Sequence, residues 1–307
     1  MEPFAAARTD VGALYRREER RGEKGLTRMT PLTYSMLVQD GLQRAGDQRM
    51  PSGDPLVSSP LTSTLIVGDA TAVLVDPPLT QEQTRRVGDW IEHSGKQLAH
   101  IYITHGHGDH WFGTGELLRR FPTAQAWASP EAIAMMHYQS TTGRALRWDK
   151  DFPGLIGDTP VVARPVPEDG LLLEGHVLKP VPTHHTDTDH TSVLHIPDLG
   201  LVVAGDAVYN NVHLYLSEGA NGGFAAWLRA LETVEGLRPV AVVAGHQDRS
   251  RPDTPDTIAQ TRGYLNDVEY LLARHPTPTA FYEEMLVRHP GRLNPSPLWY
   301  GAQTLLG

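Results

Sequence analysis

The sequence contains no cysteine. Disulfide bonds are therefore excluded, as are thiolate metal ligands and a thiol nucleophile. Basic side chains are also in the minority, with 27 Lys and Arg against 36 Asp and Glu and a formal net charge of −9. Because nucleic acids and anionic membrane surfaces are bound through basic patches, this balance argues against both as partners.

Long apolar runs are missing too, since none approaches the roughly 20 residues that a membrane-spanning helix needs. Residues 1–28 are rich in Arg and Glu and have no apolar segment of the signal-peptide type. We therefore expect a cytoplasmic protein. We interpret residues 1–28 as a polar extension, either partly helical or disordered, with Met29 as an alternative start, and residues 29–307 as one domain.

What the chain does have is a histidine-rich segment, Thr104 to His110, which reads T-H-G-H-G-D-H. Imidazole and carboxylate side chains suit zinc and other divalent first-row metals. The two-residue spacing cannot direct these side chains to one face of a helix, whereas a glycine-containing loop can wrap around metal ions. The apolar run 98–103 before it predicts a buried strand. A histidine-rich surface loop is the alternative, but the combination favours a metal site.

Short apolar runs and helical patterns alternate along the rest of the chain. The runs 62–67 and 71–75 flank Gly68 and Asp69 and predict a β-hairpin, and 44–59 has a loop composition. Further strands are predicted at 124–128, 170–173, 177–181, 192–196, 201–204 and 240–244, and helices at 80–94, 115–121, 130–140, 223–235, 255–274 and 279–289. Each half has strands first and helices after, which predicts two packed sheets with helices outside.

Three other segments place a His or Asp directly after an apolar run. They are T-H-H-T-D at 183–187, G-D at 205–206 and G-H at 245–246. Together with Asp76 and the 104–110 segment, these motifs resemble, in order, those of the metallo-β-lactamase superfamily over residues 60–250. The resemblance lies with its glyoxalase II and lactonase-like branch, and it implies an α+β fold, a four-layer αββα sandwich of two mixed β-sheets.

The resemblance also implies two metal sites, most simply two Zn²⁺ ions. Asp76 would hold the metal loop by hydrogen bonds without binding metal, and His184 would lie behind His185 or face solvent. The implied ligands are His105, His107 and His185 for the first ion, Asp109, His110 and His246 for the second, and Asp206 as a bridge.

A metal pair about 3.5–4 Å apart can activate a shared water as hydroxide for attack on a carbonyl. We expect a hydrolase of carboxylic esters, lactones or thioesters, with a small-molecule substrate. Asp109 would move a proton to the leaving group. Tyr209, placed as in lactonases of the family, would donate a hydrogen bond to the developing oxyanion. The pocket could also be lined by ring side chains near the metal loop or in irregular segments, with packing in the core or an interface as the alternative for each: Trp111, Phe112, Trp148, His213 and Tyr215.

Other functions remain open on the sequence. A mononuclear iron enzyme of the persulfide-dioxygenase type would use only His105, His185 and Asp206. A β-lactamase is disfavoured because no cysteine ligand and no export signal are present. A binding protein with a residual metal site is the third alternative. The C-terminal helices would either cap the pocket or form a homodimer face.

Overall fold

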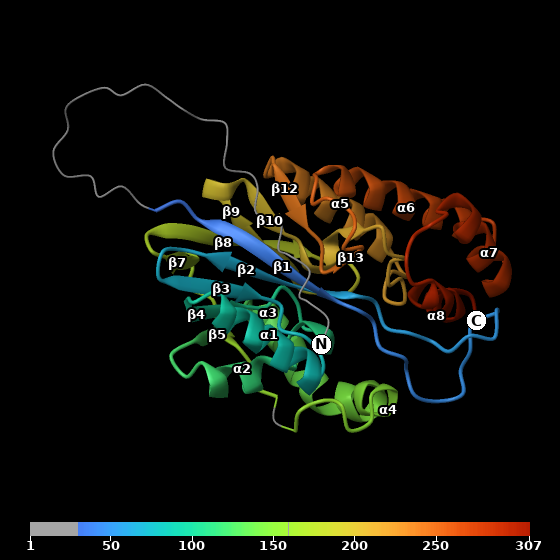
Figure 1. The fold of residues 1–307 in the computed structure, drawn as a ribbon. Helices are drawn as coiled ribbons and strands as arrows, with labels where there is room; N and C mark the ends of the chain where they lie inside the picture. Colours follow the sequence, from blue (N-terminus) through green and yellow to red (C-terminus); the bar gives the residue numbers. More distant parts are fainter. Residues whose placement is uncertain (1–29, 159) are drawn as a thin grey trace.

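The computed structural model describes residues 30–158 and 160–307 (Figure 1). The extension predicted for residues 1–28 lies outside the described residues, and the single domain predicted for 29–307 stays a prediction.

The first sheet has six strands and is mixed. Its order is β1 (Thr33–Gln39), β2 (Leu61–Val67), β3 (Thr71–Val75), β4 (Gln97–Tyr102), β5 (Gln125–Ala128) and β6 (Arg164–Pro165). The first three strands pair antiparallel and β3 to β6 pair parallel. The hairpin predicted around Gly68 is confirmed, because β2 and β3 are antiparallel neighbours.

The second sheet has five strands and is also mixed. Its order is β12 (Ala241–Val243), β10 (Leu201–Val203), β9 (Thr191–Ile196), β8 (His176–His184) and β7 (Leu171–Leu173). Only β10 and β12 pair parallel within it. A short parallel pair, β11 (Tyr209–Asn210) and β13 (His246–Gln247), lies beside these sheets.

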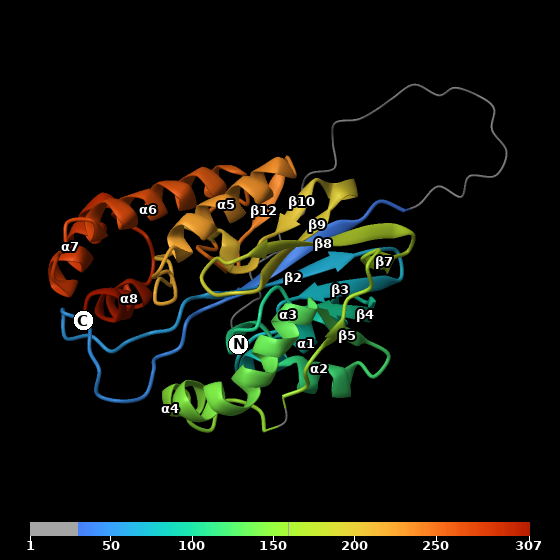
Figure 2. The same cartoon turned by 180° about the vertical axis from the view of Figure 1, so that it is seen from behind.

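Helices cover the outer faces of both sheets. Figures 1 and 2 show α1 (Gln81–His93), α2 (Thr114–Arg120) and α3 (Pro130–Tyr138) on the first sheet, and α5 (Gly223–Gly236) and α6 (Asp256–Leu272) on the second. Two more helices, α7 (Pro278–Arg288) and α8 (Ser296–Leu306), lie at one end. The predicted αββα sandwich of two mixed sheets is therefore confirmed. No described helix is both long and apolar enough to cross a bilayer.

Alternation along the strands produces the layers. On β3, Val73 and Val75 join the apolar core between the two sheets, whereas Ala72 and Leu74 join the core under α1 and α2. Successive strand residues point to opposite faces, so one strand serves two cores. On β10, Leu201 and Val203 face the core between the sheets in the same way.

One helical segment departs from α-helical geometry. A ten-residue π-helix, η2 (Gln139–Trp148), continues α3 and is followed by the short helix α4 (Asp149–Asp151). The predicted helix 130–140 therefore extends further than its apolar pattern indicates. π-Helical turns are uncommon and often occur at functional sites.

Candidate metal centre

The predicted ligands lie where strands of both sheets end. The 104–110 loop follows β4, Asp206 belongs to the short 3-10 helix η4 (Gly205–Ala207) after β10, and His246 begins β13 just after β12. Side-chain atoms of three groups lie within 4.8 Å of one another: His105, His107 and Asp187; His105, His110 and Asp206; Asp109, His110 and His246. The structure thus brings together six of the seven predicted ligands and adds Asp187.

Asp76 lies directly behind the loop. Its carboxylate accepts hydrogen bonds from the backbone N–H of Thr104 at 2.9 Å and from the Thr104 hydroxyl at 2.8 Å. The same carboxylate lies 3.0 Å from Nδ1 of His110. A carboxylate that bonds to one ring nitrogen fixes the orientation of the imidazole and leaves the other nitrogen free for a metal.

Asp206 lies between two imidazoles. Its Oδ1 is 3.3 Å from Nε2 of His110, and its Oδ2 is 3.1 Å from Nε2 of His246. Nδ1 of His246 is held by the carbonyl of Pro60 at 2.8 Å. A Cβ at Gly245 would lie 2.5 Å from Asp206 Oδ1, so glycine leaves the room that this carboxylate occupies.

His107 presents its two ring nitrogens to two carboxylates. Nδ1 lies 2.8 Å from Oδ2 of Asp187, and Nε2 lies 3.0 Å from Oε1 of Glu218. Glu218 also accepts a hydrogen bond from the Thr188 hydroxyl at 2.6 Å. The sequence interpretation missed both acids, although Asp187 lies within the T-H-H-T-D motif.

His185, the predicted ligand of the first ion, belongs to none of the three groups, although its buried Nε2 also has no hydrogen-bond partner among the described residues. Its Nδ1 lies 2.7 Å from Oδ1 of Asp189, and a Cβ at Gly223 would lie 2.5 Å from its Nε2. The ring therefore packs at the first residue of α5. His184 is exposed and has a left-handed backbone with φ of 64°. It belongs to none of the three groups, and it faces solvent, which was the second of its two predicted positions.

Several buried polar atoms of the centre have no hydrogen-bond partner in the described part of the chain. They are Nε2 of His105 and His110, Oδ2 of Asp187 and Oδ1 of Asp206, and the two oxygens have only ion-pair contacts, such as those with His107 and His110 given above. Buried polar atoms are rarely left unpartnered, because desolvation without compensation is costly. These atoms converge from separate elements, and imidazole and carboxylate are a donor set for divalent cations. The residues present therefore fit a metal pair.

The electrostatics of the centre agree with this. Burial alone would lower the pKa of His110, but the carboxylates of Asp206 and Asp109 outweigh it and raise the pKa well above its usual value. Burial would raise the pKa of Asp206, yet His246 and His110 hold it well below its usual range. A cation that binds His110 would displace the proton from its imidazole, so metal binding will release protons.

Tyr209 does not reach the cavity in front of these residues. Its ring is fully buried, and its hydroxyl donates to Oδ2 of Asp206 at 2.7 Å. Burial and the neighbouring Asp206 charge raise the pKa of Tyr209 well above its usual value, so the phenol stays protonated. This position favours a role in orienting Asp206, and it does not support the predicted contact with substrate.

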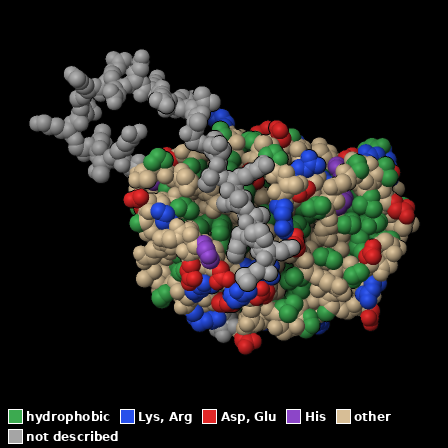
Figure 3. All heavy atoms as spheres, in the orientation of Figure 1, with side chains coloured by type: hydrophobic (Ala, Val, Ile, Leu, Met, Phe, Trp, Pro, Cys, Tyr) green, Lys and Arg blue, Asp and Glu red, His purple; other side chains and the backbone are tan. Residues whose placement is uncertain are grey.

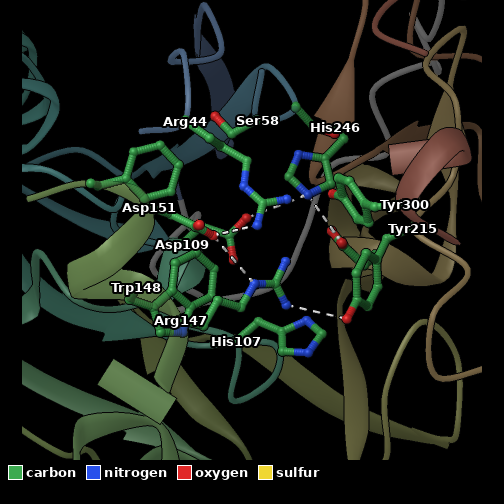
Figure 4. A pocket seen from close by; sticks show the side chains of 13 residues that line it. Arg44, Ser58, His107, Asp109, Arg147, Trp148, Asp151, Tyr215, His246 and Tyr300 are labelled. Carbon is green, nitrogen blue, oxygen red and sulfur yellow. Dashed lines mark hydrogen bonds and ion pairs between the residues drawn. The ribbon is translucent and has the colours of Figure 1, made fainter. Parts of the chain in front are cut away.

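A cavity lies in front of these residues and is partly open to solvent, and the space inside it, open solvent included, is about 480 Å³. His107, Asp109, Asp206 and His246 form one side of it. The rest of the lining, much of it labelled in Figure 4, consists of Arg44, Ser58, Ser59, Arg147, Trp148, Asp151, Phe152, Tyr215 and Tyr300. Of the five predicted lining residues, Trp148 and Tyr215 line the cavity, whereas Trp111, Phe112 and His213 are buried and are not among its lining residues.

The fold and this site define a class of protein, the αββα proteins with a histidine-rich metal loop at the strand ends. The family model described as the metallo-β-lactamase superfamily matches residues 59–246. The chain belongs to this superfamily, which is of hydrolase type, and the predicted resemblance is confirmed.

A curated hydroxyacylglutathione hydrolase from Synechococcus sp. is 36% identical over 93 residues, which are 30% of this chain and 34% of that protein. The chain thus spans about a third of the length of this curated relative.

Solved structures share the fold at low identity. A β-lactamase domain protein from Burkholderia ambifaria has a TM-score of 0.60 at 16% identity, covering 89% of this chain and 84% of that chain. A metallo-β-lactamase family protein from Thermus thermophilus has a TM-score of 0.59 at 17% identity, covering 88% and 91%. A metallo-β-lactamase from Pontibacter korlensis has a TM-score of 0.54 at 16% identity, covering 79% and 97%.

Proposed function

We propose that this protein is a dinuclear metal hydrolase, most simply a dizinc enzyme, that cleaves a carboxylic ester, lactone or thioester. The observation that carries the proposal is the position of Asp206 between His110 and His246 at the wall of the cavity. A carboxylate that faces two imidazole groups through its two oxygens is suited to bridge two cations. The hydroxyacylglutathione hydrolase relative, whose named substrate is a thioester, supports this choice of bond.

When bound, two divalent cations would polarise the scissile carbonyl and activate the attacking water. The ligands proposed for them are His105, His107 and Asp187 on one side, and Asp109, His110 and His246 on the other, with Asp206 between.

The remaining steps use groups of this chain. Asp76 and Glu218 fix the rings of His110 and His107 through the nitrogens that face away from the centre. Asp109 is about a quarter exposed towards the cavity, with Oδ2 3.8 Å from Nε2 of His246. It is therefore placed to hold a proton and pass it to the leaving group. Tyr215 lines the cavity beside His107, and its hydroxyl donates to Oε1 of Glu218 at 3.4 Å and accepts from Nη1 of Arg147 at 3.2 Å.

The test combines metal quantification with a panel of ester, lactone, thioester and β-lactam substrates. We expect two metal ions per chain and hydrolysis of at least one of the first three classes. His107→Ala should lose metal and reduce the rate of hydrolysis by at least about 100-fold, because an ion that would activate the water loses one of its ligands. His137→Ala, at an exposed position on α3, is the matched control and should keep both properties.

Full metal loading without turnover of any ester-type substrate would reject the proposal. One iron per chain, or turnover of β-lactams alone, would replace it with one of the alternative activities.

A further inference from the structure

The cavity contains two arginines that the hydrolytic steps above do not use. Arg147 is the last residue but one of η2, and Arg44 lies in the loop after β1. Figure 4 shows both side chains extending from opposite walls towards the same part of the cavity, beside His107 and His246. Two guanidinium groups in front of a metal centre are a feature that needs an explanation, because charged groups are costly to enclose.

Arg147 is oriented by its surroundings but is not neutralised by them. Its Nη1 donates to the Tyr215 hydroxyl at 3.2 Å, and its guanidinium lies 5.0 Å from the Trp148 ring centre and 5.2 Å from that of Tyr215. Asp151 is 3.9 Å from Nε, beyond hydrogen-bond distance. Nη2 has no hydrogen bond within the described residues, and the side chain is 35% exposed. Its donor edge is thus available to a ligand.

Arg44 is committed to the protein. Its Nη2 is 2.7 Å from Oδ2 of Asp151, and its guanidinium lies 5.0 Å from the ring centre of Tyr300. Asp151 therefore neutralises one of the two arginines. Asp109 and Asp206 also line the cavity, but neither forms a hydrogen bond with Arg147, so the Nη2 edge of Arg147 stays open.

The site also has a defined distance from the metal centre. The ring centre of Tyr215 lies 5.5 Å from that of His107 and 5.2 Å from the guanidinium of Arg147. Arg147 and the proposed ligand His107 thus pack on the same aromatic ring. A short aliphatic chain is long enough to span the width of that ring. Trp148 and Phe152 add apolar surface to the same side of the cavity.

We propose that Arg147 binds a carboxylate of the substrate, so that this hydrolase acts on esters, lactones or thioesters that carry a carboxylate a few carbons from the scissile bond. The inference rests on the proposed function. A planar guanidinium edge matches a carboxylate through paired hydrogen bonds.

The test uses matched pairs of N-acetylcysteamine thioesters of equal chain length. Monothioesters of succinic, glutaric and adipic acid are compared with thioesters of butanoic, pentanoic and hexanoic acid. The wild type should favour the carboxylate-bearing member of at least one pair in kcat/KM. Arg147→Met should reduce this preference ratio by about 10- to 100-fold, the usual weight of a charge-assisted hydrogen bond.

Two further variants make the result specific. Arg147→Lys keeps the charge without the planar donor edge and should retain part of the preference. Arg86→Met removes an arginine that is 60% exposed on α1 and should leave the ratio unchanged. Circular dichroism and metal content identify a variant that fails to fold. An equal rate for both members of every pair, or an unchanged ratio in Arg147→Met, would overturn the proposal.

Failure of the hydrolase proposal gives a different result. If the wild type cleaves no thioester, calorimetric titration with adipic acid monoamide and with hexanamide still tests the carboxylate site. Stronger binding of the charged amide that is lost in Arg147→Met supports the site. Equal binding by both proteins rejects it, since the metal centre is common to both.

Discussion

Asp187 and His185 are two residues apart, yet their side chains have different surroundings. Asp187 is fully buried with its Oδ2 2.8 Å from Nδ1 of His107, whereas His185 contacts Asp189 and lies against Gly223. Burial would raise the pKa of Asp187, but the His105 and His107 imidazoles outweigh it and lower the pKa. An ionised buried carboxylate of this kind fits a cation ligand.

We therefore expect Asp187→Asn to lose about one metal ion per chain, because the first ion would keep only two imidazoles and a share of the Asp206 carboxylate. His185→Gln should keep both ions. Metal quantification gives the stoichiometry, and absorption of the cobalt-substituted protein reports the ligand environment of each ion. Loss of metal in His185→Gln together with retention in Asp187→Asn would restore the histidine assignment.

The motif alone could not decide between these two residues. T-H-H-T-D offers three donors in four positions, and the sequence interpretation selected His185 from its resemblance to the family. The left-handed backbone of His184, with φ of 64°, turns the chain immediately before His185 and Asp187 and so affects where their side chains point. Such a local turn depends on the pairing of β8 with β9, which residue spacing does not reveal.

At the level of elements, one glutamate joins the turns of the two sheets. Glu174, between β7 and β8, accepts hydrogen bonds from the backbone N–H groups of Asp69, Ala70 and Thr71 in the β2–β3 turn, at 2.6 to 2.8 Å. These bonds and the Thr71 hydroxyl lower the pKa of Glu174 to about 2. The carboxylate therefore connects the β7–β8 turn of the second sheet to the β2–β3 turn of the first.

Glu174→Gln keeps the shape of the side chain and removes its charge. We expect it to lower the free energy of unfolding by only about 1 kcal/mol at pH 7, because charged acceptors form the stronger hydrogen bonds but solvent screens this exposed group. The folded-state pKa is depressed, so this stabilisation is present above pH 4.5 and is lost as the pH falls towards 2. Urea unfolding of both proteins across this range measures the effect.

The exposed Glu168 provides the control for that experiment. Glu168→Gln should leave the stability unchanged at every pH. An equal loss in both variants would assign the effect to net charge instead of to the turn.

Strong periodicity was sufficient to predict most elements. Helix 80–94 corresponds to α1 (Gln81–His93), which begins at a Thr80 capping box, and helix 223–235 corresponds to α5 (Gly223–Gly236). β1 and α8 were not assigned. β1 is half-buried and gains its structure from full pairing with β2, and α8 contains Pro297 and Gly301, which weaken a helical signal.

The cavity wall opposite the metal loop was predictable only in part. Trp148 and Tyr215 were expected as aromatic lining residues. Arg147 was not, because its position depends on the π-helical geometry of η2, and a side-chain pattern based on 3.6 residues per turn places it elsewhere. Arg44 comes from a loop whose composition gives no indication of its direction.

On the scale of the whole molecule, charge is distributed without a separate basic side in view. Figure 3 shows acidic and basic side chains mixed over the visible face of the described residues. Ion pairs between them, such as Arg120 with Glu92 and Asp89, are exposed at the junction of α1 and α2 and contribute little each. Above pH 4.5, where Glu174 is ionised in both states, the pH dependence of stability should therefore come from a few enclosed groups.

Asp253 is the clearest of these outside the metal centre. It lies between β13 and α6, and its Oδ1 is buried without a hydrogen-bond partner in the described chain. Burial raises its pKa to about 6, opposed by a hydrogen bond from Gln247. Its charge also adds to burial in raising the pKa of Tyr34 on β1, which places the carboxylate where the first sheet meets the helical half.

The sign of the effect follows from the ionised form. Below pH 3.8, Asp253 is protonated in both folded and unfolded chains, and burial carries no charge penalty. As the pH rises through about 6, the folded protein must enclose a charge, so stability is lost. Asp253→Asn should therefore be more stable than wild type at pH 7, by at most about 3 kcal/mol, and equal to it near pH 4. Urea unfolding of metal-free protein separates this effect from metal release. The exposed Asp47→Asn control should match wild type throughout, and a gain for Asp253→Asn that is as large at pH 4 as at pH 7 would show that ionisation is not its cause.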